Sequence, residues 1–277
     1  MESKDTPESG QEQSPSGVKE AQLGTLFLVA MPIGNRDDIT VRALKVLKAV
    51  DVIVCEDPKE TAPILLHHGI SKPLEVLNEH NELKKTEEVL GYLRAAKKVA
   101  LVSDAGTPVV ADPGFELVQR ARQLGAEVVP VPGPSAIMTA VMMCGLPVDQ
   151  FLYAGFLSRI PAIRKSQLEE LAQEPRTVVI LETPYRLLPL LRTAAEVIPD
   201  RPAYVGCNLT MPSETHHYGT VKELLAKFEQ LRFKGEFVFC FAGLPQHDLP
   251  DAESRKPQQR SHKGRKRSKG RKGKRRR

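Results

Sequence analysis

The sequence contains no tryptophan, and aromatic residues make up only 5% of its 277 positions. Hydrophobic residues nevertheless account for 41%, which is enough for ordinary cores in one large or two small α/β domains. No apolar run approaches the roughly 20 residues that a membrane-spanning helix requires. The first 19 residues are polar and lack the apolar stretch of a signal peptide. We therefore expect a cytoplasmic protein with no membrane association.

Cysteine is scarce, and no pair is spaced as C-x-x-C. Each of the four cysteines lies in or beside an apolar run (Cys55, Cys144, Cys207 and Cys240). This pattern predicts buried thiols in a reducing compartment. His216 and His217 are adjacent and have no partner at metal-ligand spacing, so we expect no metal site.

Acidic residues are absent from the C-terminal end. Residues 255–277 contain 14 lysines and arginines, so the net charge of +6 for the whole chain leaves −8 for the other residues. With almost no apolar side chains, such a segment cannot fold alone. It is typical of an arm that binds RNA by neutralising phosphates. A solubilising or general anion-binding tail is the alternative.

The phosphate-binding patterns G-x-x-x-x-G-K-[ST] and G-x-G-x-x-G are missing. Strands and helices are instead predicted in alternation over the first half of the chain, which favours a parallel sheet with helices on its faces. The strands are expected at residues 25–30, 51–55, 73–77, 98–102 and 127–131, and the helices at 40–49, 61–67, 87–96 and 115–124.

The second half predicts a mixed α+β arrangement. Strands are expected at residues 151–155, 177–181, 203–207 and 236–241, and helices at 137–144, 161–173, 185–197 and 221–231. The fold class is thus two α/β domains, residues 24–133 and 134–243. Disordered segments are expected at 1–23 and, as the basic tail, at 244–277.

Three loops that follow predicted strands are rich in glycine and proline: residues 32–35, 103–114 and 132–135. Ligands of parallel sheets bind at the carboxyl ends of the strands, and glycine allows the backbone to approach them closely. The 103–114 loop also carries hydroxyl and carboxylate groups. From the residues alone, a ligand-binding loop and a plain connection remain equally open.

Several motifs occur together in order: GTLFLVAMPIGN at Gly24–Asn35, Glu56-Asp57, His80–Glu82, LVSDAGTP at Leu101–Pro108, DPG at Asp112–Gly114 and VPGP at Val131–Pro134. The combination resembles the ribosomal RNA small subunit methyltransferase I family of the tetrapyrrole methylase superfamily, over Gly24 to Gly243. The resemblance implies S-adenosylmethionine-dependent methylation of a cytidine ribose 2′-hydroxyl in 16S rRNA of the 30S subunit. It also implies a cofactor cleft between the two α/β domains, and a homodimer.

The same resemblance assigns cofactor-binding positions in both domains. In the first loops they are Pro32, Ser103, Asp104, Ala105, Gly106, Val109, Ser135 and Ala136, and in the second domain Phe156, Leu181, Asn208 and Ala242.

A ribose hydroxyl that attacks a methyl group needs a base or an orienting acceptor. The candidates in the matching loops are Asp57, Asp104 and His80, although loop acids often cap helices or fix turns instead. Candidate substrate-binding residues are Lys59, Asn81, Glu82, Glu182 and Arg186. For Glu182 and Arg186 the alternative is a salt bridge between the domains.

The sequence departs from the family pattern at several positions. Lys59 replaces an arginine and Tyr185 a histidine, while Cys207, Asn208 and Met211 replace charged residues next to a retained Glu214. These changes leave open an altered target or reduced activity. Two alternatives follow: an S-adenosylmethionine-binding RNA-binding protein without catalysis, and a small-molecule methylase of the tetrapyrrole type. The basic tail and the SDAGTP loop argue against the second.

Overall fold

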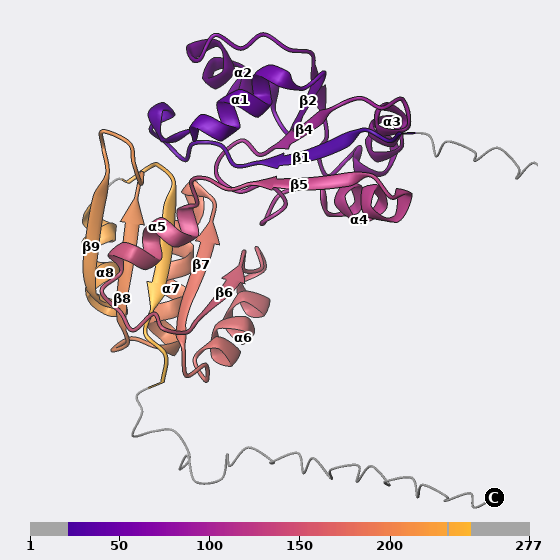
Figure 1. Cartoon of the computed structure of the whole chain (residues 1–277). Helices are drawn as coiled ribbons and strands as arrows, with labels where there is room; N and C mark the ends of the chain where they lie inside the picture. Colours follow the sequence, from indigo (N-terminus) through magenta and orange to yellow (C-terminus); the bar gives the residue numbers. More distant parts are fainter. Residues whose placement is uncertain (1–21, 232, 245–277) are drawn as a thin grey trace, which may run out of the picture.

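The computed structural model describes residues 22–231 and 233–244, which form two layered α/β units (Figure 1). The terminal segments for which we predict disorder and RNA binding lie almost entirely outside the described residues. Within the described residues, no helix is both long and apolar enough to cross a membrane.

The first unit is built on a five-stranded sheet in which every pairing is parallel. Its strand order is β3-β2-β4-β1-β5, so consecutive strands are joined by helical crossovers as the alternation of elements predicts. The strands are β1 (Thr25–Val29), β2 (Val52–Cys55), β3 (Leu74–Val76), β4 (Val99–Val102) and β5 (Glu127–Val131).

Helices cover both faces of this sheet because alternate side chains of its strands are apolar on both sides. Ile53 and Cys55 of β2 pack with α1 (Val41–Ala49) and α2 (Pro58–His67). Val52 and Val54 pack on the opposite face with α3 (Glu82–Arg94) and α4 (Phe115–Leu124). Strands buried on both faces explain the near-continuous apolar runs in the sequence.

The second unit has a mixed sheet in the order β6-β7-β10-β8-β9. Only β6 and β7 pair in parallel, and the other pairings are antiparallel. Its strands are β6 (Phe151–Gly155), β7 (Thr177–Glu182), β8 (Pro202–Cys207), β9 (Thr215–Thr220) and β10 (Phe237–Phe241). Strand β9 is missing from the prediction because an edge strand of sequence THHYGT lacks the apolar run on which the other strands were recognised.

The faces of the second sheet carry different helices. On one face Val178 and Phe239 pack with α6 (Pro161–Leu171), α7 (Leu187–Val197) and α8 (Val221–Gln230). On the other, Val179 and Cys240 pack with α5 (Ala136–Met143), which crosses the sheet alone (Figure 1). All four cysteines are buried and free, which confirms the prediction of buried thiols.

Helix starts differ most from prediction. Helix α2 begins at Pro58 rather than Thr61, because Asp57 caps it and proline is well suited to the first helical position. Helix α3 begins at Glu82, five residues before the predicted start. A short 3-10 helix, η1 (Arg36–Asp38), precedes α1, and another, η2 (Pro184–Arg186), occupies the first turn predicted for α7.

Candidate functional site

A cleft of about 810 Å³ lies between the two units, lined on one side by residues that follow the carboxyl ends of β1, β2 and β4. The first unit contributes Pro32, Ile33, Gly34, Arg36, Glu56, Glu60, Pro63, Ile64, Asp104, Ala105, Val110, Ala111 and Asp112. The second contributes Ala136, Phe156, Leu181, Glu182, Thr183, Leu209, Met211, Glu236, Phe237 and Val238. The location agrees with the general rule for parallel sheets, and the volume is that of a small-molecule site.

The loop that follows β4 is held against the turn that follows β1 by backbone hydrogen bonds. Met31 N–H donates to the Gly106 carbonyl over 2.8 Å, and Gly106 N–H donates back over 3.0 Å. The buried Ser103 hydroxyl donates to the same Gly106 carbonyl. Gly106 has φ +79°, a conformation that glycine adopts without steric cost. Ser103 and Gly106 therefore fix the conformation of the loop without lining the cleft, while Asp104 and Ala105 line it.

The next part of this loop is strained. Val109 and Ala111 have φ values of +72° and +67°, although side chains with a Cβ rarely adopt this region. The resulting path brings Val110 and Asp112 to the cleft. Strained backbone of this kind persists only where the surrounding structure enforces it, and it concentrates at ligand sites.

Carboxylates dominate the electrostatics of the first-unit wall. Burial, together with the nearby carboxylates of Glu56 and Asp104, raises the pKa of Asp112 to about 7. Burial also raises the pKa values of Glu56 and Asp104, with neighbouring carboxylates adding to the rise. Like charges in a poorly solvated space disfavour their own ionisation. This wall therefore favours a cationic ligand and holds a group that takes up a proton near neutral pH.

On the second-unit wall, Glu182 is buried at the end of β7. Its Oε1 accepts from Thr183 N–H over 2.8 Å and pairs with the Arg186 guanidinium at 2.9 Å. Arg186 also donates to the carbonyls of Leu157 and Ser158. The ion pair thus lies within the second unit, and the predicted alternative of a salt bridge between domains is wrong. Among the described residues, Glu182 Oε2 has no hydrogen-bond partner.

The predicted cofactor positions fall into three groups. Pro32, Asp104, Ala105, Ala136, Phe156 and Leu181 line the cleft, whereas Ser103, Gly106, Val109, Ser135 and Asn208 belong to the loops and caps behind its walls. Ala242 does not belong to the site. It follows β10 at the end away from the cleft, where its N–H donates to the Pro202 carbonyl. The five residues of that strand place it about 16 Å from the cleft end, which corrects the prediction.

Of the predicted catalytic residues, only Asp104 lines the cleft. Asp57 caps α2 by accepting from Lys59 N–H, and its own N–H donates to Asp104 Oδ1 over 3.1 Å. The exposed His80 lies in a turn that is held by Asn78 and by the side chain of Asn81.

Among the predicted substrate-binding residues, Lys59, Asn81 and Arg186 do not line the cleft, while Glu182 does. Glu82 accepts from Gly114 N–H over 2.8 Å, so its carboxylate serves the start of α4.

Sequence reasoning missed Glu56 and Asp112 as site residues. Both lie in motifs that carry the resemblance, Glu56-Asp57 and Asp112–Gly114, so the signal was present. It missed Glu236 as well, whose pKa burial raises and which follows Lys234-Gly235. No group of three or more histidines, cysteines or acids that could hold a metal ion occurs in the described part of the chain.

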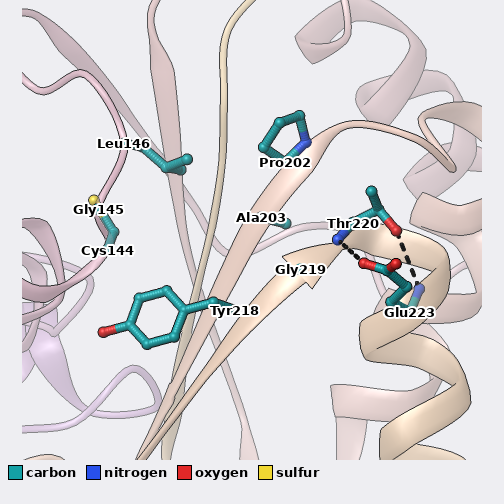
Figure 2. Close-up of a pocket in the computed structure, with 9 residues that line it drawn as sticks. All are labelled: Cys144, Gly145, Leu146, Pro202, Ala203, Tyr218, Gly219, Thr220 and Glu223. Carbon is teal, nitrogen blue, oxygen red and sulfur yellow. Dashed lines mark hydrogen bonds between the residues drawn. The ribbon is translucent and has the colours of Figure 1, made fainter.

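A second, smaller cavity of about 330 Å³ lies at the opposite end of the second sheet (Figure 2). It is bordered by Pro202 and Ala203 at the start of β8 and by Gly219 and Thr220 at the end of β9. Its one carboxylate, on Glu223, already accepts from Thr220 N–H over 2.8 Å as part of the cap of α8. We therefore place the candidate functional site in the large cleft rather than in this cavity.

Comparison with known proteins agrees with this placement. The family model described as tetrapyrrole (corrin/porphyrin) methylases matches residues 25–225. The chain is 44% identical over 232 residues to ribosomal RNA small subunit methyltransferase I of Escherichia coli O157:H7, covering 82% of this chain and 81% of that protein. It is 42% identical to the protein of the same name from Thermotoga maritima, covering 80% of this chain and 99% of that one.

Solved structures share the fold at lower identity. A cobalt precorrin-4 methyltransferase superposes with a TM-score of 0.61 at 18% identity, covering 79% of this chain and 94% of the other. A uroporphyrin-III-C-methyltransferase from Thermus thermophilus superposes with a TM-score of 0.58 at 22% identity, with 79% and 94% covered. With the cleft, its loops and the close relatives in agreement, the chain belongs to the tetrapyrrole methylase family and, within it, to the ribosomal RNA small subunit methyltransferase I proteins.

Proposed function

We propose that this methyltransferase transfers a methyl group from S-adenosylmethionine, bound in the large cleft, to a cytidine ribose 2′-hydroxyl of 16S rRNA in the 30S subunit. The single observation that carries the proposal is the carboxylate-lined cleft at the carboxyl ends of the first sheet, formed by the loops of the family motifs. Family membership supplies the reaction class and the rRNA substrate.

The residues present fit S-adenosylmethionine. Its sulfonium and amino groups are cationic, and the cleft offers Glu56, Asp104 and Asp112 on one wall. The buried Glu182 Oε2 has no hydrogen-bond partner among the described residues, so it is free to accept from a ligand. When bound, the cofactor supplies an electrophilic methyl group on its sulfur.

Asp112 is the strongest candidate for the base. It lines the cleft, and its carboxyl has a pKa of about 7. A base is most effective when its pKa lies near the operating pH, because it is then both ionised and able to hold a proton. Asp112 would accept the proton of the 2′-hydroxyl as that oxygen attacks. Asp104, the second carboxylate of the loop, would face the cationic cofactor.

The carboxylates that favour the cofactor repel RNA phosphates. Arg36 is the one arginine or lysine among the residues that line the cleft of the described structure. RNA affinity must therefore come from outside it, and the basic segment 255–277 is our candidate, by phosphate contacts that carry no base specificity. This segment lies outside the described residues.

A homodimer in the cytoplasm completes the proposal. Helix α5 supports the dimer, because all three of its methionines are exposed on the surface. The exposed fractions are 50% for Met138, 75% for Met142 and 39% for Met143. Contiguous apolar side chains on a surface mark association sites.

An RNA-binding protein without catalysis is the second candidate. The observation in its favour is that Asn208 and Met211, which replace charged residues of the family pattern, lie in the turn that borders the cleft. A small-molecule methylase of the tetrapyrrole type is the third.

Two measurements separate the proposed function from the two alternatives. Calorimetry with S-adenosylhomocysteine tests the cofactor site, and transfer of labelled methyl groups to 30S particles, with mapping of 2′-O-methylation, tests the reaction. Cofactor binding without transfer to 30S would support one of the alternatives. Absence of cofactor binding would refute the proposed site.

A further inference from the structure

One wall of the cleft is formed by a turn with an unfavourable backbone. Leu209 and Met211 line the cleft, and the residues that alternate with them, Asn208 and Thr210, have φ values of +49° and +66°. Threonine is β-branched, so it adopts this left-handed region only where other contacts enforce it. The turn therefore needs an external support.

A carboxylate provides this support. Glu214 accepts from the Thr210 N–H with Oε2, and its Oε1 lies 2.8 Å from His216 Nε2. His216 Nδ1 in turn lies 2.8 Å from the hydroxyl of Tyr204, which is fully buried. A carboxylate only accepts, so Nε2 carries the proton and Nδ1 of a neutral ring accepts from Tyr204. The turn is thus tied to the core of the second unit.

The same turn is also tied to the first unit. Asn35 N–H donates to the Thr210 hydroxyl over 3.0 Å. The β1 turn and the 208–211 turn are in close contact at Gly34, which lines the cleft. A Cβ on Gly34 would lie only 2.8 Å from the Leu209 carbonyl oxygen. A continuous series of hydrogen bonds therefore runs from Tyr204 through His216, Glu214 and Thr210 to the β1 turn.

We propose that Glu214 and His216 are positioning residues that hold Leu209 and Met211 in the cleft wall, and so set the affinity for the cofactor without contacting it. Neither residue lines the cleft, so the effect must pass through the turn. The inference rests on the proposed function, because it takes the cleft as the cofactor site.

The first variant is Glu214→Gln, which keeps the size of the side chain. An amide has one accepting oxygen, so when this oxygen accepts from Thr210 N–H, the NH₂ group faces His216 Nε2 and the ring must exchange its tautomer to keep its bonds. The bond from Thr210 N–H also loses the negative charge of the carboxylate that strengthens it. We expect the turn to leave its bound conformation most of the time. If that conformation is populated about one tenth of the time, the apparent affinity falls about tenfold.

Glu223→Gln is the matched control. Glu223 also accepts from a backbone N–H of β9, that of Thr220, but at the far end of the strand beside the smaller cavity (Figure 2). Both variants remove one carboxylate that holds a backbone amide. A role in stability alone would lower the thermal unfolding temperature of both and leave the affinity for S-adenosylhomocysteine unchanged.

The measurement is calorimetric titration of the full chain with S-adenosylhomocysteine, together with thermal unfolding and the kcat and KM for S-adenosylmethionine. We expect Glu214→Gln to raise Kd and KM about tenfold with kcat within about threefold, and Glu223→Gln to change none of them. His216→Phe keeps a ring stacked on Tyr204 but removes the link, and should raise Kd in the same direction. If Glu214→Gln does not fold, the Kd of His216→Phe for S-adenosylhomocysteine tests the proposal in its place.

The possible failures are distinguishable. Wild-type protein that does not bind S-adenosylhomocysteine refutes the proposed cofactor site. Wild-type binding with unchanged Kd in Glu214→Gln and His216→Phe, or equal changes in Glu214→Gln and Glu223→Gln, overturns the positioning role alone.

Discussion

Replacing Asp112 by asparagine should stabilise the protein above neutral pH while it slows methyl transfer. Burial, Glu56 and Asp104 raise the pKa of this carboxyl from 3.8 to about 7. The folded protein therefore retains a proton that the unfolded chain releases, and between about pH 4 and pH 7 its stability falls as pH rises. The penalty is complete above pH 7 and absent below about pH 4. Asparagine carries no charge and avoids it.

The size of the effect follows from the same pKa. A rise from 3.8 to about 7 corresponds to at most about 4 kcal/mol, since each pKa unit is worth 1.36 kcal/mol. Asp112 is only partly buried, so solvent screening reduces this figure, and we expect about 2 kcal/mol at pH 8. For a protein of this size, that corresponds to a rise of about 4–8 °C in the unfolding temperature.

Catalysis should respond in the opposite direction. As the base, Asp112 must be ionised, so the wild-type rate should fall about tenfold per unit below pH 7, and Asp112→Asn should lose about 10²- to 10⁴-fold. Asp57→Asn is the comparison, because asparagine caps a helix as well as aspartate does. The assays are thermal unfolding at pH 5 and pH 8 and methyl transfer to 30S particles.

Two results would refute the reasoning. One is an Asp112→Asn variant that is less stable than wild type at pH 8, which would mean that the carboxylate is stabilising there. The other is an Asp112→Asn variant with the wild-type rate, particularly if Asp57→Asn is the inactive one.

Three further predictions follow. Gly106→Val should abolish binding of S-adenosylhomocysteine in calorimetry, because Gly106 has φ +79° and a Cβ there would lie 3.3 Å from Ile33; retained binding would contradict our account of the loop. The protein should sediment as a dimer at micromolar concentration and Met142→Lys as a monomer, whereas a monomeric wild type would exclude the dimer. Truncation after Ser254 should leave cofactor affinity unchanged, weaken 30S binding and lower its salt dependence by about one unit of slope per lost phosphate contact; unchanged affinity and slope would make the tail a solubilising extension.

Much of the fold was predictable because strands buried on both faces produce apolar runs that can be recognised locally. The runs at β1, β4 and β5 identified a parallel sheet, and the glycine- and proline-rich loops identified its ligand-binding edge. Edge strand β9 escaped prediction because it lacks such a run. The start of α3 was placed too late because its first turn is polar and partnered elsewhere: Glu82 accepts from Gly114, 32 residues away.

The sequence by itself determined most of the elements and their order, although not edge strand β9, and it determined which loops carry the motifs of the site. Only the tertiary structure decided which carboxylates act together, because the pKa of Asp112 depends on burial, on Glu56 from the loop after β2 and on Asp104 from its own loop. It also excluded Ala242, which lies at the far end of β10. The hydrogen bond from Thr210 N–H to Glu214 could not be predicted either, because a threonine in the sequence does not indicate a left-handed backbone. Periodicity and motifs are local properties of the chain, whereas proximity and desolvation arise only when distant segments pack together.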